Sequence, residues 1–256
     1  MSSDLISHLA VKNPKSTSTP VRIVFNSSQT FQGASLNGAL AKGPDAYLNN
    51  LIGILLRWRE GAVGLTADIR KMYNSVYIEE LEQHTHRFLW RDMEDREPDV
   101  YVILRVNMGD RPAGAISTEA LYKTAELFKE RYPDVYKLLL SSTYVDDIID
   151  SVPDFESALS LARNTNSVLS EAGFKTKHWQ ISKESAPRVD LDSVPTEVRE
   201  NITRVLGVCW ETSRDRIVFN ISLNFSKKKG GVYIEPDLQL CSIPKTLPTI
   251  YLDVKF

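Results

Sequence analysis

The sequence predicts an α+β fold, because strand-like and helix-like patterns follow one another along the chain. Short apolar segments at 21–25 and 63–67 have the length and composition of strands. The region 113–132 shows the longest helical periodicity, with apolar residues three or four positions apart. An adjacent pair of acids, Asp146 and Asp147, lies among apolar residues and indicates a hairpin turn. These patterns alone indicate mixed α and β structure.

Turn residues and apolar spacing define the expected elements of the N-terminal half. Residues 1–20 are polar and rich in Ser, Thr and Lys, which indicates a loop or an extended lead-in. A helix is expected after Gly43-Pro44, because Leu48, Leu51 and Leu55 recur on one face. The expected elements are a strand at 21–25, a helix at 45–60, a strand at 63–67, a helix at 79–93 and a strand at 100–106.

Proline and glycine divide the C-terminal half. Pro133 is expected to end the helix at 113–132, and Gly173 to cap a helix that opens at 151–154. Leu138-Leu139-Leu140 and Ile148-Ile149 are interpreted as the two arms of the hairpin that carries the acid pair. The remaining expected elements are a strand at 175–181 and a hairpin formed by 205–210 and 216–221, whereas 226–256 give no clear pattern.

The composition is that of an ordinary globular protein. The chain has 256 residues, 42% hydrophobic and 25% charged, enough for one large domain or two small ones. A formal net charge of -2 is unusual for a nucleic-acid binder, which is more often basic. Neither a secretory signal core nor an apolar stretch of membrane-spanning length occurs, so we expect no membrane partner.

Cysteine and histidine give no sign of a disulfide framework or a zinc site. Cys209 and Cys241 are too few for either. His84 and His86 fall two positions apart in a helix-like run, where they would lie on different faces, so a solvated surface is expected for both.

Three acids suggest a metal site. Asp68 ends the apolar strand at 63–67, and Asp146 and Asp147 lie at the hairpin turn. Neighbouring carboxylates repel each other, and a cation between them relieves the repulsion. Magnesium prefers such oxygen ligands, and a site with two ions suits phosphoryl or nucleotidyl transfer. For an isolated Asp-Asp pair, a solvated turn remains the alternative interpretation.

Several short motifs carry a resemblance to a known family. Tyr144-Val145-Asp146-Asp147 is similar to the Tyr-x-Asp-Asp signature of reverse transcriptases, and Asp68-Ile69-Arg70-Lys71-Met72-Tyr73 is similar to their first palm motif. More narrowly, the region 21–210 resembles the reverse transcriptase of BEL/Pao-type LTR retrotransposons. The supporting segments are Val21-Arg22-Ile23-Val24-Phe25-Asn26-Ser27-Ser28, Ser35-Leu36-Asn37, Gly43-Pro44, Gly173-Phe174-Lys175-Thr176-Lys177 and Leu206-Gly207-Val208-Cys209-Trp210.

The resemblance implies an RNA-directed DNA polymerase that adds deoxynucleotides to a primer 3′-OH. Its fold would be the fingers–palm part of a right-hand polymerase, with a ferredoxin-like palm sheet and an incomplete thumb. By this resemblance the fingers-like segment covers 1–62, the palm 63–210 and a partial thumb or connection 211–256. Two Mg²⁺ ions, or Mn²⁺, would be held by Asp68, Asp146 and Asp147, with the backbone carbonyl of Ile69 as a further ligand.

The resemblance also assigns substrate contacts. Tyr73 would exclude the 2′-OH of ribonucleotides, while a buried core tyrosine is the alternative. Arg22 and Lys15 would grip the triphosphate, although Lys15 is equally explained as a solvated loop lysine. Lys177, or with less support Lys175, would protonate the leaving pyrophosphate, with a surface lysine as the alternative.

Two glycines complete the expected site. Gly109 would form a turn under the templating base pair, and Gly207 would hold the primer end, although both are also ordinary turn residues. Further basic candidates for backbone contacts to nucleic acid are Lys12 and the run Lys227-Lys228-Lys229.

The expected partners are an RNA template, a DNA primer and deoxynucleoside triphosphates, together with the protease, ribonuclease H and integrase domains of a polyprotein. The resemblance implies an intracellular protein, in the cytoplasm, in virus-like particles or in the nucleus. The main alternative is an inactive retroelement remnant that acts at most as a nucleic-acid-binding module. A viral RNA replicase is disfavoured by Tyr73, where such enzymes tend to have a small or acidic side chain.

Overall fold

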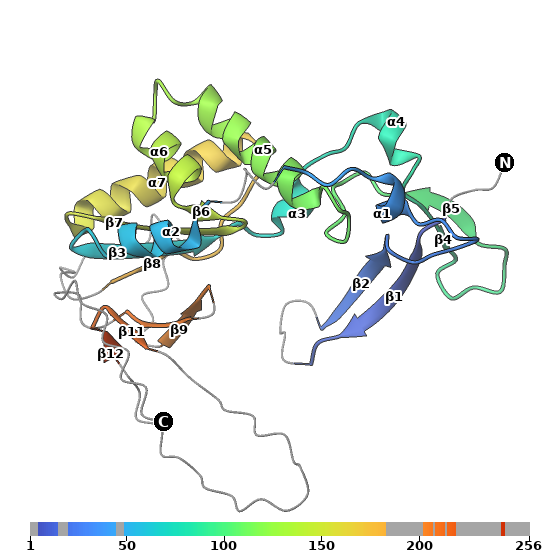
Figure 1. Ribbon diagram of the computed structural model, residues 1–256, viewed down its shortest axis with the longest axis horizontal. Helices are drawn as coiled ribbons and strands as arrows, with labels where there is room; N and C mark the ends of the chain where they lie inside the picture. Colours follow the sequence, from blue (N-terminus) through green and yellow to red (C-terminus); the bar gives the residue numbers. More distant parts are fainter. Residues whose placement is uncertain are drawn as a thin grey trace, which may run out of the picture. The chain divides into compact units, whose positions relative to one another are not determined.

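The computed structural model describes residues 5–14, 20–44, 49–182, 202–206, 208–212, 214–218 and 242–243 (Figure 1). Helices and antiparallel sheets alternate in it, as the mixed α and β pattern predicted. The chain forms two compact units that interleave along the sequence. The first unit comprises Met1–Asn49, Ile69–Ser141 and Asn166–Lys175, and the second comprises Asn50–Asp68, Ser142–Thr165 and Thr176–Phe256.

The central sheet of the second unit has the strand order β6-β7-β3-β8 (Figure 1). Strand β3 (Val63–Asp68) pairs antiparallel with both β7 (Asp147–Val152) and β8 (Gln180–Ile181). The first five residues of β3 are buried, so this strand is a continuous apolar run rather than an alternating one. Strand β6 (Thr143–Tyr144) pairs with the outer side of β7 and places a tight turn at the sheet edge.

A second sheet of this unit has the order β12-β11-β10-β9. Its strands are β9 (Ile202–Val205), β10 (Val208–Glu211), β11 (Arg216–Val218) and β12 (Ser242–Ile243). The predicted hairpin is confirmed in β10 and β11, but the expected strand at 205–210 is wrong, because the chain reverses at Leu206, where φ is 48°.

Tryptophans form the core that joins helix α2 (Leu51–Arg57) to these strands. Trp58 and Trp210 are fully buried, with ring centroids 4.9 Å apart, and they pack with Ile54 and Ile149. Asp215, also buried, accepts hydrogen bonds from Trp210 Nε1 at 2.9 Å and from the Arg59 guanidinium at 2.8 Å. Burying an unpaired carboxylate would destabilise the fold, but these two hydrogen bonds offset that cost, so Asp215 stabilises the core.

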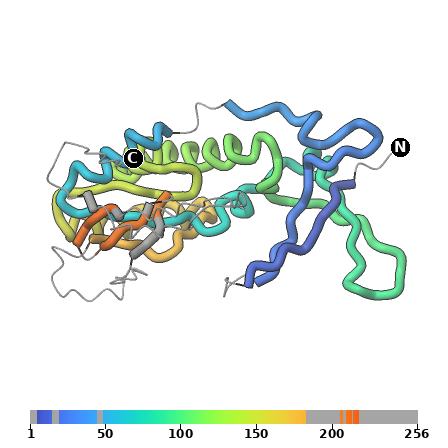
Figure 2. Tube along the Cα trace, turned by 60° about the horizontal axis from the view of Figure 1, so that its bottom comes forward, coloured from blue at the N-terminus to red at the C-terminus, as the bar shows by residue number. Residues whose placement is uncertain are grey.

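The first unit contains two antiparallel pairs and helices of four to 15 residues. Strand β1 (Ser7–Lys12) lies beside β2 (Val21–Asn26) as a ribbon, and β4 (Arg87–Trp90) pairs with β5 (Asp99–Val102) (Figure 2). Aromatic contacts join the two pairs, with Phe25 and Phe88 centroids 4.9 Å apart. The helices are α1 (Leu36–Ala39), α3 (Met72–Ser75), α4 (Glu80–Gln83), α5 (Ala113–Leu127) and α6 (Pro133–Ser141).

Two expected elements of this unit are wrong. The helix expected at 79–93 ends after the single turn of α4, because Phe88 and Trp90 belong to strand β4 and pair with β5. The strand expected at Leu138-Leu139-Leu140 is part of α6, where Leu138 and Leu139 are buried. A short leucine run fits a strand or a buried helix face equally, and Pro133 begins a helix here.

Helix α7 (Phe155–Glu171) follows the prediction closely. Asp154 Oδ1 accepts a hydrogen bond from the Ser157 amide at 2.8 Å, which satisfies a free donor of the first turn. At the other end Gly173 adopts φ +80°, as a helix-terminating glycine does. The expected strand at 175–181 is reduced to β8. Among the described residues, no helix combines the length and the apolar character that crossing a membrane requires.

Candidate active site

The pairing register of the second unit brings the predicted acids together. Asp68 is the last residue of β3 and Asp147 the first of β7, and the two are directly opposite across the antiparallel pair. Tyr144 is opposite Asp147 in the β6–β7 pair, so Val145 and Asp146 form the turn between the strands. The main chain at Val145 has φ 56°, a left-handed conformation that β-branched residues seldom adopt. A strained turn therefore presents Asp146 beside Asp68 and Asp147.

Two of the three carboxylates, Asp146 and Asp147, are not fully compensated by a neighbouring cation. Burial and the charge of Asp68 raise the pKa of Asp146. Burial and the charges of Asp146 and Asp68 raise the pKa of Asp147 to about 6. Lys177 opposes these effects without cancelling them. An arrangement that makes ionised acids unfavourable favours either a proton or an added cation.

Lys177 already bonds to one of these acids. Its ammonium lies 2.7 Å from Asp68 Oδ2, and its amide donates to the Asp68 carbonyl, also at 2.7 Å. Both side chains remain partly exposed, 57% for Lys177 and 31% for Asp68. As the side chains stand, no three His, Cys, Asp or Glu groups in the described ranges are arranged to hold a metal ion. Lys177 thus binds an oxygen of Asp68 that was expected to bind a metal ion.

The remaining predicted site residues belong to the first unit or lie outside the described residues. Fully buried Ile69 follows Asp68 directly and begins a first-unit segment, while Tyr73 lies in α3 and is partly buried. Arg22 is exposed on β2, opposite Val11. The positions outside the described residues are Lys15, Gly207 and Lys227-Lys228-Lys229.

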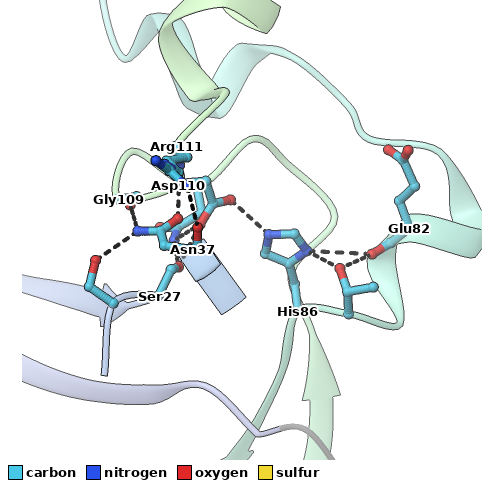
Figure 3. A network of polar contacts seen from close by, with 10 residues as sticks. Ser27, Asn37, Glu82, His86, Gly109, Asp110 and Arg111 are labelled. Carbon is cyan, nitrogen blue, oxygen red and sulfur yellow. Dashed lines mark hydrogen bonds and ion pairs between the residues drawn. The ribbon is translucent and has the colours of Figure 1, made fainter. Parts of the chain in front are cut away.

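A polar network holds the turn that contains Gly109 (Figure 3). Asn37 donates from Nδ2 to the Gly109 carbonyl at 2.9 Å and accepts from the Arg111 amide at 2.9 Å. A Cβ on Gly109 would lie 3.0 Å from the Phe25 carbonyl oxygen, closer than side chains ordinarily pack. The close approach of the backbone therefore favours glycine at this position, and Asn37 fixes the turn from one side.

Asp110 and His86 fix the same turn from the other side (Figure 3). Their Oδ2 and Nε2 atoms are 2.7 Å apart, and both side chains are under a tenth exposed. Asp110 Oδ1 also accepts from Ser27 Oγ at 2.5 Å and Asn107 Nδ2 at 2.8 Å. Burial favours the neutral carboxyl, but the hydrogen bonds from His86, Ser27 and Asn107 outweigh it and lower the pKa of Asp110.

His86 has the hydrogen-bonding pattern of a protonated ring. The Thr85 hydroxyl donates to the Glu82 carbonyl at 2.7 Å, so it accepts from His86 Nδ1, 2.8 Å away. Burial lowers the pKa of His86, but the bond to Asp110 and its charge more than offset this, and the pKa is raised. The expectation of a solvated His86 is wrong. Its acidic partner lies 24 positions away, where no local pattern connects the two.

Comparisons with known proteins bear on the fold. No protein-family model matches the chain, and no curated protein matches it. It is similar to a foamy viral protease-reverse transcriptase solved with an RNA/DNA hybrid, at 18% identity and TM-score 0.53, over 82% of this chain and 23% of that one. A foamy viral protease-reverse transcriptase solved with double-stranded DNA gives 17% identity and TM-score 0.55, over 83% and 30%.

These similarities establish a reverse-transcriptase-like fold. The chain spans less than a third of the length of either solved relative. At identities of 17–18%, the similarity shows the fold alone.

Proposed function

We propose that this chain is the reverse-transcriptase domain of a BEL/Pao-like retroelement, an RNA-directed DNA polymerase that extends a primer 3′-OH. The observation that carries the proposal is the pairing of Asp68 with Asp147 across β3 and β7, with Asp146 on the adjoining turn. Three carboxylates from two neighbouring strands and their connection supply the oxygen ligands that nucleotidyl transfer requires. The reverse-transcriptase-like fold supports the same interpretation.

The donor set fits divalent magnesium. Asp68, Asp146 and Asp147 are hard oxygen ligands. Burial, and then the charge of Asp68, raises the pKa of Asp146, and burial with the charges of Asp146 and Asp68 raises that of Asp147. In the proposal these three side chains, with the Ile69 carbonyl, hold two Mg²⁺ ions or Mn²⁺. When bound, the ions would supply a lowered pKa for the primer hydroxyl and stabilisation of charge on the transferred phosphoryl group.

Lys177 has a role of its own in this proposal. Its bond to Asp68 Oδ2 keeps one acid neutralised before a cation arrives. Release of that bond frees an ammonium group next to the acids, where it is able to donate a proton to a leaving phosphate. Tyr73, Arg22 and Lys15 are proposed to contact the incoming nucleotide, and Gly109 and Gly207 the template and primer.

Nucleic acid is the proposed substrate. The two solved relatives are named as complexes with an RNA/DNA hybrid and with double-stranded DNA. A copying enzyme has to accept any sequence, so we propose contacts mainly to the sugar–phosphate backbone, with Lys12 and Lys227-Lys228-Lys229 among the basic candidates. Protease, ribonuclease H and integrase domains of the same polyprotein are proposed as further partners.

Primer extension tests this function. Purified protein is given a DNA primer on an RNA template with deoxynucleotides and Mg²⁺, and the Asp146→Asn variant is compared with wild type. The matched control is Asp95→Asn, an identical change at an exposed acid. Extension that survives in the control and disappears in Asp146→Asn supports the proposal. A folded wild type that binds primer–template without extending it would instead identify a nucleic-acid-binding module, an outcome consistent with Lys177 occupying Asp68.

A further inference from the structure

His86 and Asp110 join three separate segments of the first unit (Figure 3). His86 lies just before strand β4, Asp110 lies before helix α5, and Ser27 follows strand β2. Asp110 Oδ2 is 2.7 Å from His86 Nε2, and Asp110 Oδ1 accepts from Ser27 Oγ at 2.5 Å. The Ser27 carbonyl in turn accepts from the Asn37 amide at 2.8 Å. The contacts that hold the Gly109 turn from both sides therefore meet at one nearly buried ion pair.

Only a protonated His86 ring donates from both of its nitrogens. Nε2 faces the Asp110 carboxylate, and Nδ1 faces the Thr85 hydroxyl, whose own hydrogen is directed to the Glu82 carbonyl. A neutral imidazole has a single N–H, so after deprotonation one of the two nitrogens presents a lone pair to an acceptor. Loss of the proton also removes the positive charge that strengthens the contact with Asp110, whichever nitrogen keeps its hydrogen.

The charges that act on His86 favour its protonated form. Burial lowers the pKa of His86, but the hydrogen bond and charge of Asp110, together with Glu82, raise it above 6.5. The arginines that adjoin the pair in sequence bond elsewhere, Arg87 to His84 and Arg111 to Asn37. The charge on the ring is therefore present at acidic pH and is lost as the pH rises through the raised pKa.

We propose that His86 is a positioning residue whose protonation fixes the Gly109 turn. A charged ring holds Asp110 toward the start of strand β4, and a neutral ring relaxes that hold. Because the Phe25 carbonyl oxygen lies 3.0 Å from the place of a Cβ on Gly109, a small movement of the turn changes the space at this glycine. The consequence for nucleic acid rests on the proposed function, in which Gly109 contacts the template. Binding of primer–template should then weaken as His86 loses its proton.

Nuclear magnetic resonance tests the coupling without nucleic acid. The His86 ring and the Gly109 and Arg111 amides are followed in the full chain from about pH 5 to about pH 9. We expect both amides to shift with the midpoint of His86, and that midpoint to lie above 6.5. In His86→Gln, whose side-chain amide donates but does not titrate, the two amides should not shift. Amides that remain unchanged while wild-type His86 titrates overturn the proposal.

A second variant addresses the same coupling from the acid. Asp110→Asn keeps the size of the side chain and removes the charge that acts on His86. The midpoint of His86 should fall in this variant, and the Gly109 amide should follow it to the lower pH. This result stands even where His86→Gln does not fold. A Gly109 amide that keeps the wild-type midpoint in Asp110→Asn contradicts the coupling.

Fluorescence anisotropy with a labelled RNA/DNA hybrid measures the consequence for binding. Wild type should bind about fivefold more weakly at about pH 9 than at about pH 6, as expected when a hydrogen bond loses its charge assistance. His86→Gln should bind equally at both. The matched control is His84→Gln, the same change at an exposed histidine two positions away, and it should keep the wild-type change. Equal pH dependence in His86→Gln and wild type overturns the positioning of nucleic acid by this residue.

The two measurements separate this inference from the proposed function. A wild type that binds no hybrid at any pH, but whose Gly109 amide follows His86, would reject the polymerase and keep His86 as the residue that positions the turn. Primer extension that survives while the Gly109 amide ignores the His86 titration would keep the polymerase and reject the role of His86.

Discussion

Asp110 of the first unit has a nearly buried side chain and Asp147 of the second is half-buried, yet their surroundings shift their pKa values in opposite directions. Asp110 receives hydrogen bonds from His86, Ser27 and Asn107, and its pKa is lowered. Asp147 faces Asp68 and Asp146, and its pKa is raised to about 6. The charge of Asp110 is therefore stabilised by hydrogen bonds within the protein. The charge of Asp147 is not, so an added cation or a proton is needed to stabilise this carboxylate.

The difference separates an acid that holds the fold from an acid that is available for chemistry. Removing Asp110 leaves a buried His86 without its partner, which penalises the folded state. Removing charge from the acid group of the second unit relieves repulsion there, so the folded state gains while any bound cation is lost. Stability and activity should therefore respond in opposite ways to substitutions in the two regions.

The largest effect is expected on catalysis. Asp146→Asn should reduce Mg²⁺-dependent primer extension at least about 10³-fold, equivalent to about 4 kcal/mol of transition-state stabilisation. The same variant should unfold at a temperature equal to or above that of wild type, because a repelled charge is gone. Single-turnover extension and thermal unfolding check both parts. If Asp146→Asn lost both activity and stability, the proposed difference between the acids of the second unit and Asp110 would be wrong.

The largest effect on folding is expected at Asp110. Asp110→Ala should lower the free energy of unfolding by about 3 kcal/mol, since it removes the acceptor of the buried His86 imidazole and of the buried Ser27 hydroxyl. Asp95→Ala, at an exposed acid, should change it by less than about 0.5 kcal/mol. Urea denaturation of the three proteins measures the difference.

The pH dependence of that loss follows from the two shifted pKa values. The lowered pKa of Asp110 adds stability above pH 3.8, which is lost as the pH falls through the folded-state pKa. The raised pKa of His86 adds stability below pH 6.5, which is lost as the pH rises through its folded-state pKa. The difference between wild type and Asp110→Ala should therefore be greatest between pH 3.8 and 6.5 and smaller at pH 9. A difference that grows toward pH 9 would contradict the protonated His86.

Binding of Mg²⁺ should raise the free energy of unfolding of wild type by less than Asp110→Ala lowers it. At a concentration ten times its dissociation constant, a bound ion adds about 1.4 kcal/mol to the free energy of unfolding. Asp68→Asn should abolish this gain, and Asp95→Asn should keep it. Thermal unfolding with and without Mg²⁺ compares the variants, and a wild type that Mg²⁺ leaves unchanged would argue against cation binding by the three acids.

The smallest effect is expected at Asp147 itself. Above pH 6 the folded protein bears the cost of ionising this acid, and below pH 3.8 it does not. Asp147→Asn should therefore be more stable than wild type at pH 7.5 in EDTA, by about 1 kcal/mol, since solvent screens a half-exposed group. The two proteins should be equally stable near pH 4. Denaturation at both pH values decides whether the repulsion exists.

The sequence predicted the secondary structure around the acids well, but it did not predict which distant residues contact them. A buried apolar run ending at Asp68 and a turn around Asp146 are visible within ten residues, and so is the glycine that ends α7. The pairing of Asp68 with Asp147 depends on strand register across the intervening chain, which periodicity does not encode. The burial of His86 against Asp110 was not predicted for the same reason, since the two residues are 24 positions apart. The helical Leu138 and Leu139 show a different limit, since a three-residue apolar run fits two secondary structures.

The interleaving of the units has a consequence during synthesis on the ribosome. Strand β3 ends at position 68, but its partner β7 begins at position 147, 79 residues later. At about 5–20 residues per second, β3 waits roughly 4–16 s for that partner. Throughout this interval its buried face and both hydrogen-bonding edges are open to other chains, so nascent polypeptides of this protein should depend on a chaperone that shields residues 63–68 until β7 emerges.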